Sequence, residues 1–291
     1  MRLERLSPCK VNLILNILGR RPDGYHDLET VMLPVPFTDV LEYRRVPSGI
    51  RLTCSHPELP VDRGNLVYRA AESFLSAAGV LDGVEIRLEK RLPLAAGLGG
   101  GSANAAVTLA ALNELWGGPL GAERLRQLAA ELGSDVPFFL QDGPALATGR
   151  GEWVESLAPF AALKGCGLVL VHPGFGVPTA WAYRTLAGYP DAVHGRPGRA
   201  AEWVAQIRSG DRIGACRELY NALEVPVLPK YPLLQVFQGF FREEGALGVL
   251  MSGSGSSTFA IVEDGARAEA IRERFVGRFG TSVWTATAVL G

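Results

Sequence analysis

The sequence predicts an α+β protein of two domains. Its 291 residues exceed the length of one typical domain and allow a sizeable core. Residues 84–89 alternate apolar with polar side chains as a half-buried strand does, whereas residues 66–78 carry apolar side chains at helical spacing. The composition changes around residues 158–165, and we place the boundary there. The predicted domains are therefore residues 1–160 and 161–291.

The overall composition limits the classes of partner. A hydrophobic share of 47% and a charged share of 20% are typical of a soluble globular protein. A formal net charge of −1 gives no general attraction to nucleic acid or to an anionic membrane, so any cationic site must be local. No apolar run approaches the length of a membrane span, and the first residues do not resemble a signal peptide. We expect neither nucleic acid nor membrane as a partner.

The cysteines and histidines do not form a metal-binding or disulfide pattern. Cys9, Cys54, Cys166 and Cys216 are far apart in the sequence and include no C-x-x-C pair. The four histidines likewise lack the spacing of a metal site. This usage indicates reduced thiols and favours a cytoplasmic location.

A glycine-rich stretch, GLGGGSANAA from Gly97 to Ala106, is the most informative segment. It follows the predicted strand, and Ser102 stands where the N-cap of a helix over residues 103–116 is expected. Glycines let backbone amides approach a ligand, and a helix N-terminus favours phosphate. No Gly-Lys-Ser/Thr follows, so this is not a Walker A motif, and the amphipathic strand argues against a dinucleotide fingerprint. A glycine turn that only caps a helix is the alternative. The residues expected on the buried stripe of this helix are Ala103, Ala106, Val107, Ala110, Ala111 and Leu115.

Residues 10–17, KVNLILNI, predict a strand with a polar face that carries Lys10, Asn12 and Asn16. The turn residues 22–24, Pro-Asp-Gly, follow and would bring Tyr25 and His26 beside that face. An edge strand with a solvated face and a structural histidine are the alternatives.

The remaining pattern completes the predicted order of elements. Asn65 is a candidate helix cap, and Asp135 is either the cap of a helix that starts near Pro137 or a catalytic base. Residues 252–257, SGSGSS, join two apolar strands and predict a hairpin loop that lines a site. Further strands are expected at residues 39–46, 50–53, 145–148, 153–156, 168–172, 247–251, 258–262 and 282–290. Further helices are expected at residues 125–132, from 178 onward, and at 200–209, 212–223, 233–244 and 266–279, with a loop at 188–199.

Four stretches in this order carry a family resemblance. They are KVNL with DGYH at residues 10–13 and 23–26, the glycine loop, GSDVPFF at residues 133–139, and SGSG at residues 252–255. The chain resembles the galactokinase–homoserine kinase–mevalonate kinase–phosphomevalonate kinase (GHMP) superfamily over nearly its whole length. The first and third stretches resemble the branch that acts on a cytidyl-diphosphate derivative of methylerythritol. The resemblance implies a ribosomal-protein-S5-like N-terminal domain that carries ATP, followed by a ferredoxin-like C-terminal domain that contributes to the acceptor site.

The resemblance also implies roles for individual residues. Lys10 and Asp135 would be catalytic, with Asp135 as the base and Lys10 beside it. Tyr25 and Tyr183 would hold the cytosine, and His26 would bind its edge. The implied ATP-binding residues are Asn65, Pro93, Leu94, Ala95, Ala96, Gly97, Leu98, Gly99, Gly100, Gly101, Ser102 and Ala103. The other implied substrate-binding residues are Asn12, Thr179, Gly253 and Ser254.

Two positions depart from the family pattern. Ala95 stands where the family usually has glycine, and Ala103 stands where it often has a second serine. Each adds a methyl group that could tighten the phosphate loop. The glutamate that binds Mg²⁺ in other branches has no counterpart that we can place, so the metal ligands stay unknown and nucleotide phosphates with water are expected to hold Mg²⁺.

The implied activity is ATP-dependent phosphorylation of the C2 hydroxyl of 4-diphosphocytidyl-2-C-methyl-D-erythritol, in the non-mevalonate route to isoprenoid precursors. Its expected ligands are ATP, Mg²⁺ and the cytidyl-diphosphate substrate, in a monomer or a homodimer. Another kinase of the superfamily, such as a homoserine kinase, is one alternative. A non-catalytic S5-like module that binds RNA is a second, which the near-neutral charge disfavours.

Overall fold

A computed structural model describes residues 2–291, which form two compact units. Unit 1 comprises the chain up to Cys9, Pro36–Leu92 and Gly99–Asp142. Unit 2 comprises Lys10–Val35, Pro93–Leu98 and Gly143–Gly291. The chain therefore passes between the units several times, and the domain boundary near residues 158–165 stays a prediction.

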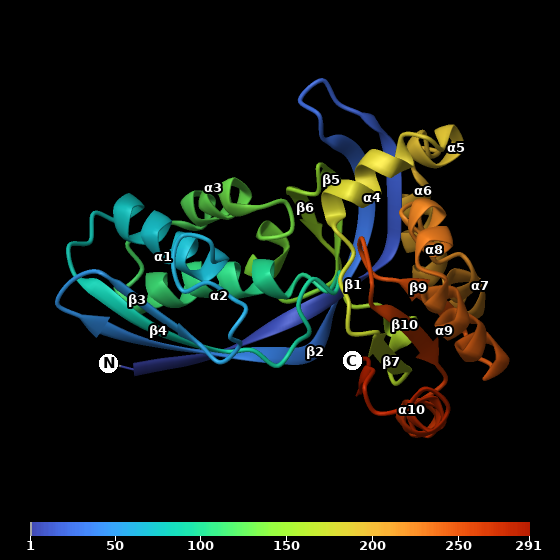
Figure 1. Cartoon of the computed structure of the whole chain (residues 1–291). Coiled ribbons are helices and arrows are strands. Elements are labelled where there is room, and N and C mark those ends of the chain that lie inside the picture. The colour runs from blue at the N-terminus through green and yellow to red at the C-terminus, as the bar shows by residue number, and fades with distance from the viewer. Residues whose placement is uncertain (1) are drawn as a thin grey trace. The chain divides into compact units, whose positions relative to one another are not determined.

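Unit 1 is a sheet with helices on one face (Figure 1). β3 pairs in parallel with β4, and β4 pairs antiparallel with residues 40–46 of β2. Helix α2 packs against α1, α3 and η1, so side chains on nearly all of its sides are buried. The elements are the start of β1 (Arg2–Arg20), the end of β2 (His26–Val46), β3 (Ile50–Cys54), α1 (Leu66–Ala77), β4 (Gly83–Glu89), α2 (Gly100–Leu115), α3 (Ala122–Leu132) and η1 (Pro137–Leu140).

Unit 2 contains the other halves of β1 and β2 and all later elements. Residues 28–32 of β2 pair antiparallel with β5, which forms a hairpin with β6, while residues 14 and 15 of β1 pair in parallel with β8. The strands are β5 (Ala145–Gly149), β6 (Trp153–Ser156), β7 (Gly167–His172), β8 (Tyr220–Asn221), β9 (Gly248–Met251), β10 (Thr258–Val262) and β11 (Trp284–Val289). The helices are η2 (Ala161–Leu163), α4 (Thr179–Leu186), α5 (Pro190–Val193), α6 (Arg199–Arg208), α7 (Arg212–Arg217), α8 (Glu224–Lys230), α9 (Pro232–Glu243) and α10 (Gly265–Phe279).

A second sheet in unit 2 has the strand order β11-β7-β10-β9, with every neighbouring pair antiparallel. Helices α9 and α10 pack their aromatic side chains against it, which removes a large apolar area from water. The buried aromatic residues of this core are Phe237, Phe240, Phe241 and Phe275. The α+β class predicted from the sequence is thus confirmed.

The strand predicted at residues 10–17 is part of β1, which runs to 19 residues, pairs with both β2 and β8, and is buried on both faces there. The edge-strand alternative is therefore excluded. Several other local predictions were wrong. The helix expected at residues 212–223 ends at Arg217, and β8 follows it. Helix α5 lies within the expected loop at residues 188–199. In α2, Ala110 is exposed and Val107 is half-buried, because the burial of this helix is set by its many neighbours and not by a single stripe.

Two further observations concern the cysteines and the lengths of the helices. None of the four cysteines forms a disulfide within residues 2–291. None of the helices within residues 2–291 combines the length and the apolar character needed to cross a bilayer.

Candidate active site

In unit 1, α2 begins at the glycine loop without a side-chain cap. Gly99 is its N-cap, in the left-handed conformation at φ +69°, and no side chain caps the helix. The amides of the first turn, from Gly100 to Ser102, therefore remain available to a ligand at the positive end of the helix dipole. The prediction that Ser102 is the N-cap was wrong, because the helix begins at Gly100, three residues before the predicted start, and Ser102 lies in its first turn.

The preceding segment, residues 93–98, belongs to unit 2 and is held there by main-chain hydrogen bonds. The Ser257 amide donates to the Ala96 carbonyl at 3.1 Å, and the Lys10 amide donates to the Leu98 carbonyl at 2.9 Å. Gly97 lies at φ +75°, and a Cβ there would be 2.0 Å from the Ser252 carbonyl oxygen. Only glycine fits this position.

The Lys10 ammonium lies against this segment. Lys10 is 3% exposed, and its Nζ donates to the Gly97 carbonyl at 3.0 Å and to Asn12 Oδ1 at 2.5 Å. Asn12 Nδ2 donates in turn to Thr30 Oγ1 at 2.8 Å, which fixes the Asn12 amide with its oxygen toward Lys10. The strand thus holds the buried Lys10 side chain beside the glycine loop.

The β9–β10 loop, residues 252–257, completes this part of unit 2. A Cβ on Gly253 would lie 3.3 Å from Lys10 Nζ and 2.9 Å from the Gly97 carbonyl, so this glycine allows a close approach. The hydroxyls of Ser254 and Thr179 are 2.8 Å apart. Thr179 and Ser254 are 75 residues apart in the sequence, yet their side chains meet at this loop. Lys10 and Gly253 lie at the same loop.

The aromatic residues predicted for the acceptor site lie in two separate contacts. The rings of His26 and Tyr183 have centroids 5.2 Å apart, and the Arg150 guanidinium carbon lies 4.9 Å from the centre of the Tyr25 ring. His26 Nε2 is buried without a hydrogen-bond partner among residues 2–291, which is the state of a group that a ligand could satisfy. Burial and the charge of Arg20 lower the pKa of His26, so its ring is neutral at neutral pH. The clamping of a base between Tyr25 and Tyr183 stays a prediction.

Asn65 and Asp135 lie in unit 1. Asn65 caps α1, where its Oδ1 accepts from the Val67 amide at 3.0 Å, so the capping alternative is confirmed and its adenine contact stays a prediction. The capping alternative for Asp135 was wrong, because the short helix at Pro137 begins after Val136 without a side-chain cap. The meeting of Asp135 with Lys10 joins the two units and stays a prediction.

Sequence reasoning missed several residues that fix the loop. Ser252 Oγ donates to the Gly97 carbonyl at 2.9 Å, so that oxygen has two side-chain donors. In unit 1, Lys90 forms an ion pair with Asp39 and both are almost fully buried. A lysine directly after a predicted strand and before a glycine loop was the signal that could have drawn attention to Lys90.

The two departures from the family pattern differ in their surroundings. Ala95 has φ +50° and is the one non-glycine residue within residues 2–291 with a positive φ. Its methyl group packs over Gly176, where an added Cβ would be only 2.5 Å away. Ala103 is fully buried within α2.

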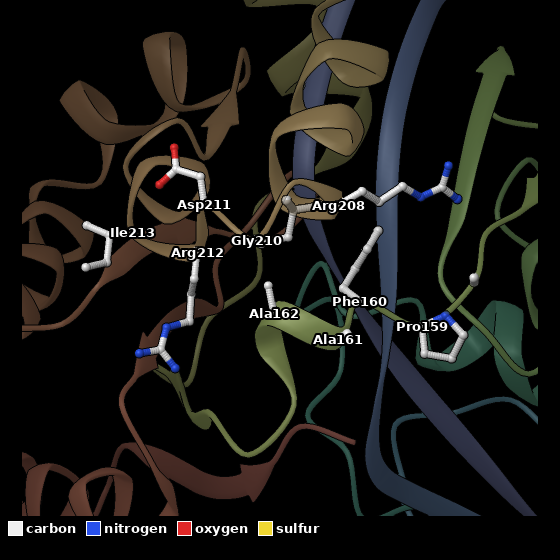
Figure 2. A pocket seen from close by; sticks show the side chains of 11 residues that line it. Pro159, Phe160, Ala161, Ala162, Arg208, Gly210, Asp211, Arg212 and Ile213 are labelled. Carbon is white, nitrogen blue, oxygen red and sulfur yellow. The ribbon is translucent and has the colours of Figure 1, made fainter.

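A separate hollow in unit 2, of about 580 Å³, lies between residues 158–162 and residues 207–213. None of the predicted site residues lines it. The guanidinium groups of Arg208 and Arg212 on its rim point in opposite directions in Figure 2, so they do not converge on one anion. It does not form part of the candidate active site.

Comparison with known proteins agrees with this geometry. Residues 65–143 match the model of the GHMP kinases N terminal domain, and residues 203–281 match that of the GHMP kinases C terminal domain. The chain belongs to the GHMP kinase family.

Individual relatives indicate which members of the family this chain resembles in sequence and in fold. The chain is 45% identical over 276 residues to the 4-diphosphocytidyl-2-C-methyl-D-erythritol kinase of Pelotomaculum thermopropionicum, a match that covers 94% of each chain. A crystal structure of 4-(cytidine 5'-diphospho)-2C-methyl-D-erythritol kinase is 39% identical and superposes with a TM-score of 0.79, covering 99% of this chain and 100% of that one. The homoserine kinase of Cytophaga hutchinsonii, at 22% identity and a TM-score of 0.77, covers 100% of this chain and 94% of its own and shares the fold.

Proposed function

We propose that this protein is an ATP-dependent kinase that phosphorylates the C2 hydroxyl of 4-diphosphocytidyl-2-C-methyl-D-erythritol, a step in the supply of isoprenoid precursors. The observation that carries the proposal is the buried Lys10 ammonium, 3.0 Å from the Gly97 carbonyl of the glycine loop. Relatives at 39–45% identity that span nearly the whole chain bear the name of this kinase.

Phosphoryl transfer asks the protein mainly to position groups and to offset negative charge. The first-turn amides of α2 and residues 93–98 bind the ATP phosphates, with Asn65 near the adenine. Lys10 stabilises charge on the transferring group. The C2 hydroxyl loses its proton to Asp135 as its oxygen bonds to the γ-phosphorus, and the bond from that phosphorus to the bridging oxygen breaks to release ADP.

The acceptor is recognised through its cytosine and its hydroxyls. The Tyr25 and Tyr183 rings stack on the base, and the neutral His26 ring binds its edge. Stacking of a base on an aromatic ring contributes about 1–3 kcal/mol, enough to hold this end of the substrate while Asn12, Thr179, Gly253 and Ser254 orient the other.

Mg²⁺ is expected to bind together with ATP, mainly through the nucleotide phosphates. Within residues 2–291, no group of three or more His, Cys, Asp or Glu side chains has the arrangement of a metal site. Mg²⁺ usually keeps several waters and binds through substrate phosphates with one or two carboxylates, so ATP would carry most of its ligands. When bound, it neutralises charge on the phosphates.

The location and assembly of the enzyme are also proposals. Four cysteines without a disulfide among residues 2–291 suit a reducing cytoplasm. We expect a monomer or a homodimer.

The decisive test is an ADP-release assay with the cytidyl substrate, with methylerythritol phosphate that lacks the cytidyl group, and with homoserine. We expect turnover with the cytidyl substrate alone. Equal rates with acceptors that lack the cytidyl group would favour another kinase of the family.

A substitution at Asp135 tests whether this residue is the general base. Asp135→Asn should lower kcat by about 10²–10⁴-fold with little change in the KM for ATP, since a general base contributes to the chemical step. Asp142→Asn, at an exposed carboxylate in the same unit, is the control and should keep wild-type turnover. Near-normal kcat in Asp135→Asn would remove this residue from the role.

A further inference from the structure

We propose that Asp39 is the positioning residue that sets the geometry of the ATP-binding loop, by fixing both of its flanks in unit 1 with one carboxylate. This inference deepens the proposed function and rests on it, since it concerns the same phosphate loop. Asp39 lies in β2 and is fully buried.

The first oxygen of Asp39 holds the chain where it leaves β4. Its Oδ1 accepts from the Arg91 amide at 2.8 Å and from the Leu92 amide at 3.0 Å. Leu92 is the last residue before the loop segment 93–98. The direction in which the chain enters the loop is therefore fixed by a side chain and not by strand pairing.

The second oxygen of Asp39 holds the start of α2. Its Oδ2 accepts from Asn104 Nδ2 at 3.0 Å and pairs with the Lys90 ammonium. Asn104 Nδ2 also donates to Ser7 Oγ at 2.8 Å, and its Oδ1 lies 3.4 Å from Lys90 Nζ. These contacts fix the Asn104 side chain. They also fix the turn of α2 that follows the amides proposed to bind phosphate.

The charges in this cluster have a second consequence. A Cβ on Gly100 would lie 3.4 Å from Lys90 Nζ and 3.8 Å from Asp39 Oδ2, so the ion pair sits directly beside the first turn of α2. An unpaired ammonium at the positive end of a helix is unfavourable, and removing one partner of a buried pair leaves an uncompensated charge. Asp39 thus balances the charge of Lys90 and, through Asn104, also orients the first-turn amides of α2 toward the phosphate.

A displacement of about 1 Å at the loop is enough to weaken phosphate binding. Asp39→Asn keeps an acceptor for the Arg91 and Leu92 amides but turns an NH₂ group toward Asn104 and Lys90. We expect the KM for ATP to rise at least tenfold, the KM for the cytidyl acceptor to stay within twofold, and the melting temperature to fall.

Two companion variants separate position from stability. Asp39→Asn with Lys90→Gln removes the unpaired charge, so the melting temperature should recover while the KM for ATP stays at least fivefold raised. Asn104→Ala removes the bonds of this side chain to Asp39 and Ser7 but leaves the Arg91 and Leu92 amides on Asp39. It should raise the KM for ATP at least threefold. It carries the test if Asp39→Asn does not fold.

Tyr43→Phe is the matched control. Tyr43 lies on the same strand and its hydroxyl is 3.0 Å from Thr108 Oγ1, one turn further along α2, with both residues fully buried. This variant should lower the melting temperature without changing the KM for ATP. An unchanged KM for ATP in both Asp39→Asn and Asn104→Ala, or an equal rise in Tyr43→Phe, would overturn the inference.

The role of Asp39 can be tested even if the proposed function is wrong. If the wild-type protein releases no ADP with the cytidyl acceptor, calorimetric titration with ATP alone still compares Asp39→Asn with the wild type and with Tyr43→Phe. A loss of ATP affinity confined to Asp39→Asn then supports the positioning role, and equal affinities refute it.

Discussion

The two halves of the glycine loop are held in different ways. In unit 2, residues 93–98 are fixed mainly through their own carbonyls, which accept from the amides of Lys10 and Ser257 and from the side chains of Lys10 and Ser252. In unit 1, the flanks on either side are fixed by one buried carboxylate, that of Asp39.

This difference predicts two kinds of sensitivity. This segment should tolerate the loss of one side-chain donor, because the Gly97 carbonyl has two and the Ala96 and Leu98 carbonyls accept from main-chain amides. It should not tolerate an added Cβ where backbone approaches backbone. A segment held by one carboxylate depends on that group. The following variants test the half in unit 2.

The largest effect is expected at Gly97. Gly97→Ala places a methyl 2.0 Å from the Ser252 carbonyl oxygen at a φ of +75°, so the loop must move. We expect the free energy of unfolding to fall by about 2–4 kcal/mol and kcat/KM for ATP to fall more than a hundredfold. Denaturant unfolding and steady-state kinetics measure both.

Gly101→Ala is its control for stability alone. An added Cβ there meets only Leu66 Cδ1, at 3.6 Å, and alanine favours a helix over glycine. The free energy of unfolding should be unchanged or higher. A Gly97→Ala protein as stable as Gly101→Ala would contradict the backbone contact.

The next effect concerns the acceptor side of unit 2 and depends on pH. The pKa of His26 lies below its ordinary value of 6.5 because of burial and Arg20, so the ring is neutral above that value. As the pH falls below 6.5 toward the lowered pKa, protonation should raise the KM for the cytidyl acceptor about tenfold and leave the KM for ATP unchanged. The same lowered pKa means that the folded state gives up stability as the pH falls through this range.

His26→Gln should make the acceptor KM independent of pH over this range, since glutamine keeps hydrogen-bonding groups that do not titrate. His172→Gln is the matched control, because His172 is also buried with a lowered pKa and an Nε2 without a partner within residues 2–291. It should alter stability only. A pH slope that survives in His26→Gln would assign the titration to another group.

A smaller effect is expected at Ser252. Ser252→Ala removes one donor to the Gly97 carbonyl, but Lys10 Nζ still donates to that oxygen. The loss should be about 1 kcal/mol in stability, with the KM for ATP raised about threefold. Ser257→Ala is the control, since the Ser257 hydroxyl is buried without a partner among the described residues 2–291. A tenfold or larger rise in Ser252→Ala would mean that the two donors do not substitute for each other.

The smallest effect is expected at Ala95. Ala95→Gly relieves a left-handed backbone conformation but increases the freedom of the unfolded chain, so the two contributions nearly cancel. The free energy of unfolding should change by less than about 1 kcal/mol, with kcat within twofold. A large gain in turnover would show that this methyl group restrains the loop during the reaction.

Much of the fold could be predicted from local pattern. The alternation at residues 84–89, the cap at Asn65 and the strand–loop–helix order at the glycines were all correct, because neighbours in sequence determine them. The errors lie where distant contacts decide. Residues 212–223 carry helical spacing throughout, yet residues 220 and 221 pair with β1 instead. Ser102 is a good cap in isolation, but Gly99 reaches the left-handed conformation that starts α2 earlier.

The sequence by itself determined which candidate groups the chain carries for the proposed reaction: the glycine loop, Lys10, and the tyrosine and histidine side chains. Only the tertiary structure decided what holds them, such as the Asp39 carboxylate beneath the loop and the Ser252 hydroxyl on Gly97. The physical reason is that a group's identity is local, whereas a buried charge or carbonyl takes its partner from whichever strand or loop the fold brings within hydrogen-bonding distance.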